Sequence, residues 1–321
     1  MIKDKIIVCV SASFEEKEAL LHTIRKYSQY STDHFAFWDE FAFTTEPLPE
    51  CDALLVFNTP GNIIRTICHP EMIVAFMMEP GIKKIHPWMF KKLNQYSRIY
   101  SPIVRSENST RSHGYLGWYF HQDYNYLKAL AIPTKNKLIS CIASNLLQLK
   151  GQRQRSRFVH LLQRKFPQID FFGKGINFIP DKMNGLLSYR YSIAIENTSA
   201  DDYFTEKIND CFLTYTVPLY YGCKNIDKYF PEKSFIQIDI EDPEMTFEKI
   251  QKVLDDDNWN DRVPAIREAR NLVLNKYQPL AGAAEIFRNI QPLSGKKKII
   301  LTPVRPIFKR LSSAIYKLMK K

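Results

Sequence analysis

Short apolar runs rich in Ile and Val alternate along the chain with longer amphipathic stretches. Apolar runs of about four to eight residues bounded by turn signals are typical of buried strands, and longer periodic stretches favour helices. We predict strands at residues 5–12, 52–57, 73–78, 98–104, 137–145 and 169–175, and helices at residues 15–27, 151–166, 263–277 and 280–290. This alternation predicts an α/β chain built on parallel sheets.

The apolar run at residues 192–195 stops at a dense set of polar side chains. Residues 196–199, Glu-Asn-Thr-Ser, follow where a buried strand is expected to end, and a helix capped by Thr205 comes next. Residues 217–221 then form the next predicted strand, which Gly222 ends. Ligands of open α/β sheets bind at the carboxyl ends of strands, and a helix N-terminus suits an anion. The sequence therefore predicts an anion site here.

The motif IENTSADDYFTEK, followed by VPLYYG, resembles the signature of the fucosyltransferases of glycosyltransferase family 10. That signature is an apolar strand, FENS or a similar tetrapeptide, Tyr-x-Thr-Glu-Lys, and a Pro-hydrophobic-Tyr-Gly ending. The resemblance implies transfer of fucose from GDP-fucose to a hydroxyl of an acceptor sugar, with inversion at the anomeric carbon. It also implies the GT-B fold, in which two Rossmann-like domains face a central cleft.

The resemblance assigns four residues of this motif to the donor. Asn197, Tyr203, Glu206 and Lys207 match donor-binding positions, with Lys207 toward the diphosphate and Glu206 toward a sugar hydroxyl, on the ribose. The chemistry agrees with this assignment, because negative charge grows on the departing diphosphate and cations aimed at its oxygens stabilise that charge.

A basic helix, GQRQRSRFVHLLQRKF, supplies candidates for a second phosphate ligand. A guanidinium binds phosphate through two parallel hydrogen bonds. The family pattern points to Arg155, while Arg153 and Arg157 remain competing candidates, and a solvated helical face is the alternative for each of them.

An inverting transferase needs a base on the acceptor side, and a carboxylate at a strand end supplies one. Glu79 directly follows the apolar run at residues 73–78, and the family's proposed base occupies a similar position. This chain has MEPG where other members have a Gly-Glu-Asn type of sequence, so a turn residue is the alternative for Glu79. Glu46 and Glu107 are the other candidate bases.

The chain divides into an acceptor-binding domain at residues 1–134, a donor domain at residues 135–294 and a tail at residues 295–321, with a polar linker near residues 133–137. In the acceptor domain, Asn58 follows a predicted strand, and Trp118 and His121 lie in an aromatic segment suited to stacking on sugar rings. Turn chemistry for Asn58 and core packing for the aromatic segment are the alternatives.

The tail holds most of the excess positive charge. The chain carries a net charge of +11, and residues 295–321 contain nine Lys or Arg and no acidic residue. Apolar positions from Val304 to Leu318 recur at helical spacing, which predicts a basic amphipathic helix on an anionic membrane. A nucleic-acid-binding tail or a packing helix is the alternative, and an apolar stripe disfavours nucleic acid.

Several other chemistries are disfavoured by the sequence. The six cysteines are scattered without CxxC or zinc spacing, and no GxGxxG, GxxxxGK or GxSxG motif occurs. Asp201 and Asp202 are adjacent rather than alternating, so no strong Asp-x-Asp metal motif is present. We expect no metal site and no obligatory cofactor. A divalent ion would at most stimulate the activity.

The sequence shows no signal peptide and no apolar stretch of about 18 residues or more. We expect a bacterial enzyme on the cytoplasmic face of the cell membrane that modifies lipopolysaccharide or another surface glycan, with no nucleic-acid partner. Two other functions remain open: the same fold with another nucleotide sugar, and a non-catalytic phosphate or nucleic-acid binder that keeps Arg155 and Lys207 without needing Glu79.

Overall fold

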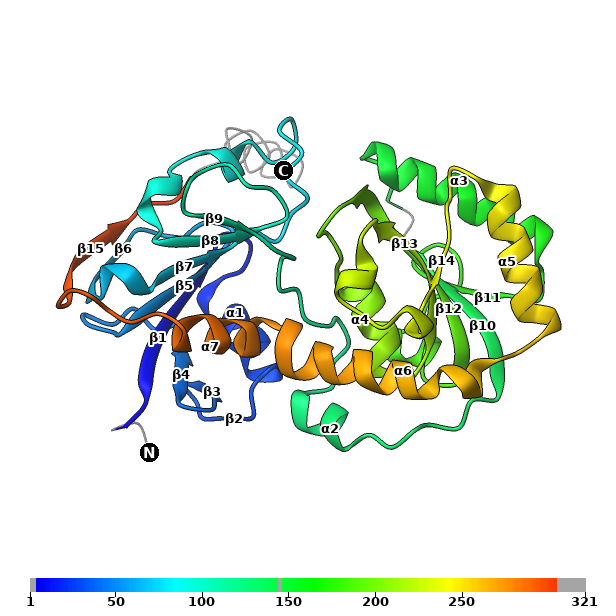
Figure 1. Cartoon of the computed structure of the whole chain (residues 1–321), viewed down its shortest axis with the longest axis horizontal. Helices are drawn as coiled ribbons and strands as arrows, with labels where there is room; N and C mark the ends of the chain where they lie inside the picture. Colours follow the sequence, from blue (N-terminus) through cyan, green and yellow to red (C-terminus); the bar gives the residue numbers. More distant parts are fainter. Residues whose placement is uncertain (1–3, 144–145, 305–321) are drawn as a thin grey trace, which may run out of the picture. The chain divides into compact units, whose positions relative to one another are not determined.

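The structure of the protein is a computed structural model that describes residues 4–143 and 146–304. The chain forms two compact units, each built on its own sheet (Figure 1). Unit 1 contains the chain up to Gly114 and the part from Ile286 onward, and unit 2 contains Tyr115–Glu285.

Unit 1 is built on an eight-stranded sheet with the strand order β2-β3-β4-β1-β5-β7-β8-β9. The strands from β4 to β9 in this order run parallel, and β2 and β3 are antiparallel additions at one edge. The elements are β1 (Ile6–Ala12), α1 (Lys17–Lys26), β2 (Tyr30–Ser31), β3 (Ala36–Trp38), β4 (Phe41–Thr44), β5 (Ala53–Phe57), β6 (Ile64–Cys68), β7 (Ile73–Phe76), β8 (Arg98–Ser101), β9 (Ser109–Arg111), β15 (Lys297–Leu301) and the 3-10 turns Pro70–Met72, Pro87–Phe90 and Leu93–Gln95.

The four predicted strands of unit 1 are confirmed as β1, β5, β7 and β8, and the first predicted helix is α1. The central strands β5 and β7 are buried along their whole length, as continuous apolar runs require in a parallel sheet. The sequence did not predict the β2–β4 edge, because strands of two to four residues are too short to show a period.

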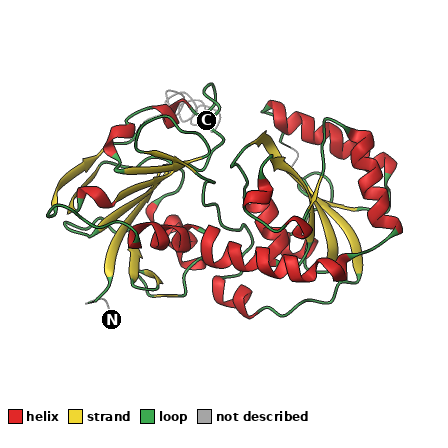
Figure 2. Ribbon diagram, in the orientation of Figure 1, coloured by secondary structure: helices red, strands yellow, loops and turns green. Residues whose placement is uncertain are grey.

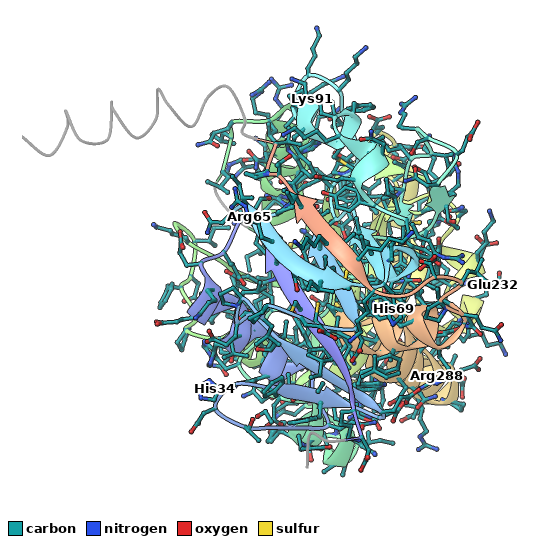
Figure 3. The ribbon with its side chains drawn as sticks, turned by 90° about the vertical axis from the view of Figure 1, so that its left-hand side faces the viewer. His34, Arg65, His69, Lys91, Glu232 and Arg288 are labelled. Atoms are coloured by element: carbon teal, nitrogen blue, oxygen red, sulfur yellow. The ribbon has the colours of Figure 1, made fainter. Side chains whose placement is uncertain are left out.

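The first part of the predicted tail, residues 297–301, forms a strand of unit 1. β15 pairs antiparallel with β6, from Lys297 opposite Cys68 to Leu301 opposite Ile64. Figure 3 shows this pair, with Arg65 of β6 and His69, the residue after β6, labelled. The predicted tail boundary is therefore wrong for residues 297–301, because apolar side chains such as Leu301 pack into the core beside β6. The predicted amphipathic helix lies mainly in residues 305–321, outside the described residues.

Unit 2 is built on a five-stranded, fully parallel sheet with the strand order β11-β10-β12-β13-β14. Helices and strands alternate through this unit, and Figure 2 shows the helices around the sheet. The elements are α2 (Tyr124–Ala129), β10 (Lys137–Ile142), α3 (Lys150–Lys165), β11 (Asp170–Phe172), β12 (Tyr189–Ala200), α4 (Glu206–Leu213), β13 (Val217–Cys223), β14 (Ile236–Gln237), α5 (Pro243–Asp255), α6 (Trp259–Leu272), the π-helical turn Val273–Tyr277, α7 (Pro279–Arg288) and the 3-10 turns Lys182–Gly185, Ile226–Lys228 and Glu232–Ser234.

The predicted strand–loop–helix–strand unit is confirmed as β12, α4 and β13, with one difference at the strand end. β12 continues to Ala200, and its pairing with β13 shifts register between Ile195 and Ala200. The polar residues 196–199 thus belong to the irregular end of a strand rather than to a loop. Such irregularities re-aim side chains at the rim of a sheet, which here carries the polar motif.

The predicted domain boundaries differ from those of the two units. Unit 2 begins at Tyr115, well before residue 135, because Asn209 Nδ2 on α4 donates to the carbonyls of Leu116 (2.8 Å) and Gly117 (3.0 Å). Residues from Ile286 onward return to unit 1, where Arg288 pairs with Glu40 at 2.9 Å. The assignment of acceptor and donor roles to the two domains stays a prediction.

Two findings concern the described residues as a whole. None of their helices is both long and apolar enough to cross a membrane. All six cysteines are free and buried, as expected for small core residues.

Lys135 is a buried lysine whose ammonium is held by oxygen atoms of unit 2. Its Nζ donates to the Thr214 carbonyl at 2.7 Å and to Thr216 Oγ1 at 3.0 Å, at the C-terminal end of α4. Burial lowers the pKa of Lys135 to about 7. The charged form is therefore less favourable in the folded protein than in the unfolded chain, where a lysine has a pKa of about 10.4.

This shift predicts how stability depends on pH. Between pH 7 and about pH 10 the unfolded chain binds the extra proton, so the contribution of Lys135 to the free energy of unfolding rises by about 1.4 kcal/mol per pH unit. Urea denaturation of the wild type and of Lys135→Met at pH 7, 8.5 and 10 measures this, because other titrating groups cancel in the difference. A difference that stays constant with pH contradicts the assignment.

Candidate donor site

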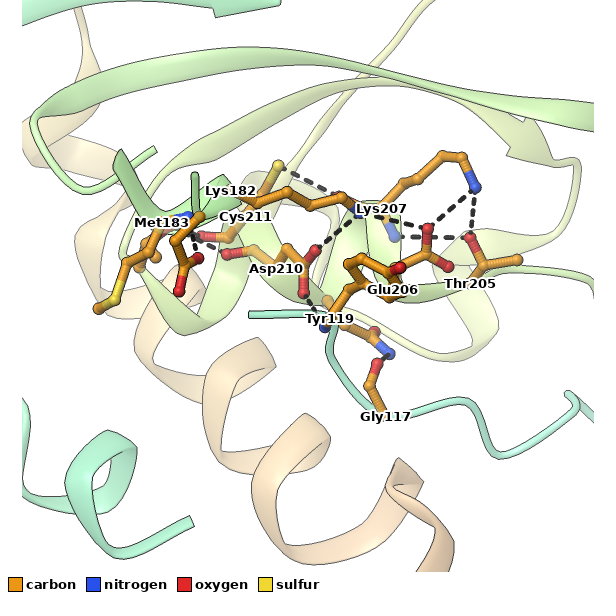
Figure 4. A network of polar contacts seen from close by, with 12 residues as sticks. Gly117, Tyr119, Lys182, Met183, Thr205, Glu206, Lys207, Asp210 and Cys211 are labelled. Carbon is orange, nitrogen blue, oxygen red and sulfur yellow. Dashed lines mark hydrogen bonds and ion pairs between the residues drawn. The ribbon is translucent and has the colours of Figure 1, made fainter. Parts of the chain in front are cut away.

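The polar motif lies where the carboxyl end of β12 meets the N-terminus of α4. Thr205 is the N-cap of α4, and its side chain accepts a hydrogen bond from the Lys207 backbone N–H. Glu206 and Lys207 form the first turn of the helix, and Figure 4 shows the network of contacts around them. The local fold follows from the sequence, since Thr is a favoured N-cap and an acidic residue is stabilised in the first turn.

Glu196 is the centre of this arrangement. Its buried carboxylate accepts hydrogen bonds from the Thr205 backbone N–H (2.9 Å), from Thr205 Oγ1 (2.7 and 2.9 Å) and from Lys207 Nζ (3.0 Å). Gly222 on the adjacent strand makes room for it, because a Cβ there would lie 2.4 Å from Glu196 Cγ. Glu196 thus ties the strand end, the helix cap and the lysine together.

Glu206 lies between two lysines. Its Oε1 is 3.3 Å from Lys207 Nζ and 3.3 Å from Lys182 Nζ. Burial disfavours the charged form of Glu206, but the ammonium groups of Lys207 and Lys182 hold its pKa below the usual range. Burial also opposes the charged form of Lys207, whose pKa is nevertheless raised by Glu196 and Glu206. Both side chains are therefore charged at neutral pH.

The same network anchors the segment that begins unit 2. Asp210 Oδ1 accepts from the Tyr119 backbone N–H at 2.9 Å, and Asp210 Oδ2 pairs with Lys182 at 3.2 Å. The Lys182 ammonium lies 4.7 Å from the centre of the Tyr119 ring. Burial raises the pKa of Asp210 to about 6, although Lys182 acts in the opposite direction. Tyr119 remains 71% exposed beside these charges, so its ring is accessible at the site.

The structure distinguishes between the three candidate arginines of α3. Arg155 is buried, and its Nη1 donates to Asn197 Oδ1 at 2.6 Å. Arg153 and Arg157 are exposed, and Arg153 donates instead to main-chain carbonyls at residues 147–148. Burial lowers the pKa of Arg155, yet a guanidinium stays protonated at neutral pH. Arg155 is therefore the arginine that adjoins the motif.

Gly151 explains how α3 approaches the end of β12 so closely. A Cβ at Gly151 would lie 1.7 Å from the Asn197 carbonyl oxygen. Any larger residue would force the first turn of α3 away from the strand, and the contact between Arg155 and Asn197 depends on that approach.

Tyr203 completes the set of predicted donor residues. It is buried, with 6% of its surface exposed, in the segment between β12 and α4. The structure thus brings Asn197, Glu206, Lys207 and Arg155 to one edge of the sheet, with Tyr203 close to them in the chain. The contacts of all five with a donor stay a prediction.

The predicted base, Glu79, lies in unit 1 just beyond β7. Its side chain is 42% exposed, and its Oε2 is 3.3 Å from His86 Nε2. Burial lowers the pKa of His86, so this imidazole is neutral at neutral pH. Sequence reasoning missed His86 as a neighbour of Glu79, although it lies only seven residues away.

The three predicted acceptor contacts have different positions. Asn58 is buried, and its Oδ1 accepts from the Met78 backbone N–H at 2.8 Å, so it holds a turn rather than presenting a side chain. Trp118 is also buried, with 2% exposed, and donates from Nε1 to the Gln122 carbonyl. The position of Asn58 fits the alternative of turn chemistry, and that of Trp118 fits core packing; contact of either residue with an acceptor stays a prediction. His121 has a side chain that is 82% exposed and lies 2.8 Å from Asp181.

Sequence reasoning also missed the role of Glu196 and of Lys182. Glu196 stood in the recognised motif, but a carboxylate at a strand end gives no sign that it is buried. Lys182 and Asp210 are 28 residues apart and meet only in the folded chain. An excess of acidic residues in the helix 206–213 was the available signal for a partner cation.

Removal of the Glu196 carboxylate is expected to destabilise unit 2. Glu196→Ala leaves Lys207 and the Thr205 hydroxyl without their buried acceptor, which costs about 3 kcal/mol of the free energy of unfolding. Urea denaturation of the wild type and the variant measures this loss. Asp170→Asn is the matched control in the same unit, since the Asp170 side chain is 48% exposed and the loss of its ion pair with Lys137 costs about 1 kcal/mol or less. Equal effects of the two changes would contradict the central position of Glu196.

Comparison with protein families confirms the resemblance seen in the sequence. Residues 132–262 match the family model described as "Glycosyltransferase family 10 (fucosyltransferase) C-term". The matched segment contains β10 to β14 and all five predicted donor residues.

Two curated relatives agree with this match. The chain is 35% identical over 60 residues to an α-(1,3)-fucosyltransferase, FucT, of Helicobacter pylori, covering 19% of this chain and 13% of the relative. It is 25% identical over 261 residues to the human GDP-fucose protein O-fucosyltransferase 3, covering 68% of this chain and 53% of the relative. The chain thus spans about half or less of the length of these relatives.

The fold is shared with a solved structure over nearly the whole chain. The crystal structure of an α1,3-fucosyltransferase with GDP covers 90% of this chain and 92% of its own, with a TM-score of 0.50 and 18% sequence identity. The fold class predicted from the sequence, an α/β chain of GT-B type with two Rossmann-like units, is confirmed. The central cleft between them stays a prediction.

Proposed function

We propose, from the match of residues 132–262 to the model of glycosyltransferase family 10, that this protein is a fucosyltransferase using GDP-fucose as its donor. The observation that carries the proposal is the contact between Arg155 and Asn197 beside the Glu196–Lys207 pair. Residues from β12, α3 and α4 meet there, at the edge of a parallel sheet where nucleotides bind.

The charges at this edge suit a nucleoside diphosphate. Lys207, at the N-terminus of α4, and Arg155, on α3, supply two cations and several N–H donors for phosphate oxygens. Glu206, held charged by Lys207 and Lys182, is an acceptor for the ribose hydroxyls. In the proposed roles, the cations bind the diphosphate and the carboxylate orients the ribose.

The same cations stabilise the reaction. As the bond from the fucose anomeric carbon to the β-phosphate oxygen breaks, negative charge grows on the GDP oxygens and positive charge on the sugar. Arg155 and Lys207 neutralise the charge of the leaving diphosphate. The proposal therefore requires no obligatory divalent ion.

The acceptor hydroxyl needs a base to become a nucleophile. In the proposed mechanism, Glu79 takes the proton of that hydroxyl as its oxygen bonds to the anomeric carbon from the face opposite GDP, which inverts the configuration. His86 Nε2 lies 3.3 Å from Glu79 Oε2, and burial lowers the pKa of His86, so this imidazole itself adds no positive charge beside the carboxylate at neutral pH. The products are the fucosylated acceptor, GDP and a protonated Glu79.

The acceptor in this proposal is a lipopolysaccharide or another surface glycan. The support is the basic, apolar-striped sequence of residues 304–318, which is typical of helices that lie on anionic membranes. We further propose that the protein acts at the cytoplasmic face of a bacterial membrane, where lipid-linked glycans are within reach.

The proposal is tested by donor turnover. Purified protein is incubated with GDP-fucose and a panel of β-galactoside and lipopolysaccharide acceptors, and fucosylated product and released GDP are measured by mass spectrometry. Equimolar fucosylated product and GDP are expected. If GDP-mannose or a UDP-sugar is turned over and GDP-fucose is not, the donor is that nucleotide sugar and not GDP-fucose. If no donor is turned over, the assignment as an enzyme is contradicted.

A further inference from the structure

The segment of unit 1 that follows β7 is rich in positive charge. Residues 80–106 contain six Lys or Arg and no Asp or Glu. Five of the six are exposed and lie between β7 and β8 or just after β8: Lys83, Lys84, Lys91, Lys92 and Arg105. Acidic residues border this stretch only at its two ends, at positions 79 and 107. A surface with one sign of charge attracts anionic partners.

Aliphatic side chains are exposed among these cations. They are Ile82 and Ile85 on either side of the first two lysines, Val104 before the arginine, and Ile63 directly before β6. Each of the four is between 37% and 47% exposed. Single exposed aliphatic side chains are common on proteins, whereas a group of them among cations matches the composition of surfaces that lie in a membrane interface.

Two contacts hold the segment after β7 against the segment after β8. The Arg105 guanidinium lies 5.1 Å from the centre of the Phe90 ring. Gly81 lies against Ile103, since a Cβ at Gly81 would be 2.1 Å from Ile103 Cδ1. Phe90 and Ile103 also pack on the same buried core cluster. The exposed residues of the two segments therefore belong to one continuous surface.

The last described residues of the chain adjoin this surface. Lys92 Nζ donates to Thr302 Oγ1 at 2.8 Å and to the Pro303 carbonyl at 3.2 Å. Lys91, labelled in Figure 3, lines a shallow pocket with Ile63 and with these three residues. We call the five cations and the four aliphatic residues together the basic–aliphatic surface.

The composition of this surface favours a lipid bilayer over other partners. Residues 305–321, with six Lys or Arg and no acidic residue, carry the same sign of charge and are therefore disfavoured as its occupant. A nucleic acid would neutralise the cations but would leave the aliphatic side chains in water. An anionic bilayer offers phosphates to the lysines and an acyl boundary to the aliphatic side chains.

We propose that the basic–aliphatic surface docks unit 1 on an anionic phospholipid bilayer. This inference rests on the proposed function, in which only the tail contacts the membrane, and it gives the folded unit a contact of its own. Weak membrane contacts become stable when two of them act together. Glu79 lies three residues before Ile82, so a bilayer at this surface adjoins the proposed base, where a lipid-linked acceptor presents its sugar.

Vesicle binding of the full chain, measured by cosedimentation, tests the charged part of the surface. Lys83→Gln combined with Lys84→Gln should weaken binding to vesicles of phosphatidylcholine and phosphatidylglycerol about tenfold to thirtyfold, because each lysine at an anionic surface contributes about fivefold. Lys228→Gln combined with Lys233→Gln, at exposed positions of unit 2, is the matched control, since it changes the net charge equally. The control should stay within about twofold of the wild type.

A polarity-sensitive fluorophore tests insertion of the aliphatic part. Ile85→Cys and Asp33→Cys are labelled in separate full-length proteins, and all six native cysteines are buried, so the label reacts at the introduced position. Asp33 is exposed between β2 and β3, at the edge of the sheet opposite β9. The emission of the probe at position 85 should shift to the blue when the anionic vesicles are added, whereas the emission at position 33 should not change.

The possible failures are distinguishable. Equal losses in the two lysine pairs, or an unchanged emission at position 85 while the protein binds the vesicles, would mean that the tail and general charge attraction account for binding, and overturn the inference. Weaker binding of duplex DNA by the Lys83 and Lys84 variant, with vesicle binding unchanged, would overturn it in favour of nucleic acid. GDP-fucose binding, measured by calorimetry, should be the same in all these proteins. Its absence in the wild type contradicts the proposed donor function, and the vesicle measurements then decide on the surface separately.

Discussion

Glu79→Gln is expected to lower kcat by about 10²- to 10⁴-fold while the affinity for GDP-fucose stays at the wild-type value. The amide keeps the shape of the side chain but accepts no proton, so the acceptor hydroxyl must react without a base. Steady-state transfer rates at saturating acceptor measure the effect, and calorimetry with GDP-fucose checks the donor site.

The surroundings of Glu79 support this expectation. The carboxylate is 42% exposed just beyond β7, so an acceptor can reach it, and its Oε2 lies 3.3 Å from His86 Nε2. Burial lowers the pKa of His86, so this imidazole is itself neutral at neutral pH. A charged imidazolium at this distance would have made Glu79 a weaker base.

Glu107→Gln and Glu46→Gln are the controls for this prediction, because both residues are alternative bases in the same unit. Each should keep kcat within a few-fold of the wild type. A large loss of kcat in Glu46→Gln or Glu107→Gln, with wild-type kcat in Glu79→Gln, would move the base to the residue affected.

Arg155→Lys is the second large expected effect, a loss of about 10²- to 10³-fold in kcat/KM for GDP-fucose. Lysine keeps the positive charge but loses the planar pair of N–H donors that fits a phosphate. Arg155 Nη1 contacts Asn197 at 2.6 Å, and a guanidinium has further N–H donors for a ligand. The single ammonium group of a lysine cannot make both contacts.

The matched control is Arg157→Lys, one half-turn further along α3 and exposed. It should keep kcat/KM within about twofold of the wild type, because conservative changes at an exposed surface position have small effects. Equal losses in Arg155→Lys and Arg157→Lys would show that the general charge of the helix matters, and not the buried arginine.

The fold was largely predictable where strands are buried on both faces. Residues 53–57 and 73–76 form continuous apolar runs, and such runs have one stable place in a parallel sheet. The hairpin-like edge formed by β2 to β4 and the pairing of β15 with β6 were not predictable. The strands β2 to β4 are short, and β15 is far from β6 in the sequence. Their pairing depends on tertiary contacts, which leave no periodic pattern in the sequence.

The candidate site was predictable as a list of residues but not as a network. The order of Asn197, Tyr203, Glu206 and Lys207 in the motif identified the donor residues, and the cap at Thr205 placed the helix. The choice of Arg155 over Arg153 and Arg157 needed the packing of α3 against β12, which Gly151 permits. Glu196 was overlooked because its role is to bind Lys207 and Thr205 as a buried acceptor. The burial of a carboxylate becomes visible only in the folded chain.

The boundary of unit 2 shows the same limit. A polar stretch at residues 133–137 resembled a linker, yet Lys135 is buried within unit 2 and donates to the Thr214 carbonyl. A polar composition shows only that a segment can be exposed to solvent. Where this segment packs is decided by the contacts of Lys135, which composition does not reveal.

The most direct test of the donor site is titration calorimetry in magnesium-free buffer, with GDP-fucose, GDP-mannose and UDP-galactose added to the wild type and to Lys207→Ala. We expect the wild type to bind GDP-fucose most tightly and Lys207→Ala to lose at least about tenfold in affinity, because a charged hydrogen bond to phosphate contributes about 1.5–3 kcal/mol. Failure of the wild type to bind either guanine nucleotide sugar, or unchanged affinity in Lys207→Ala, would contradict it.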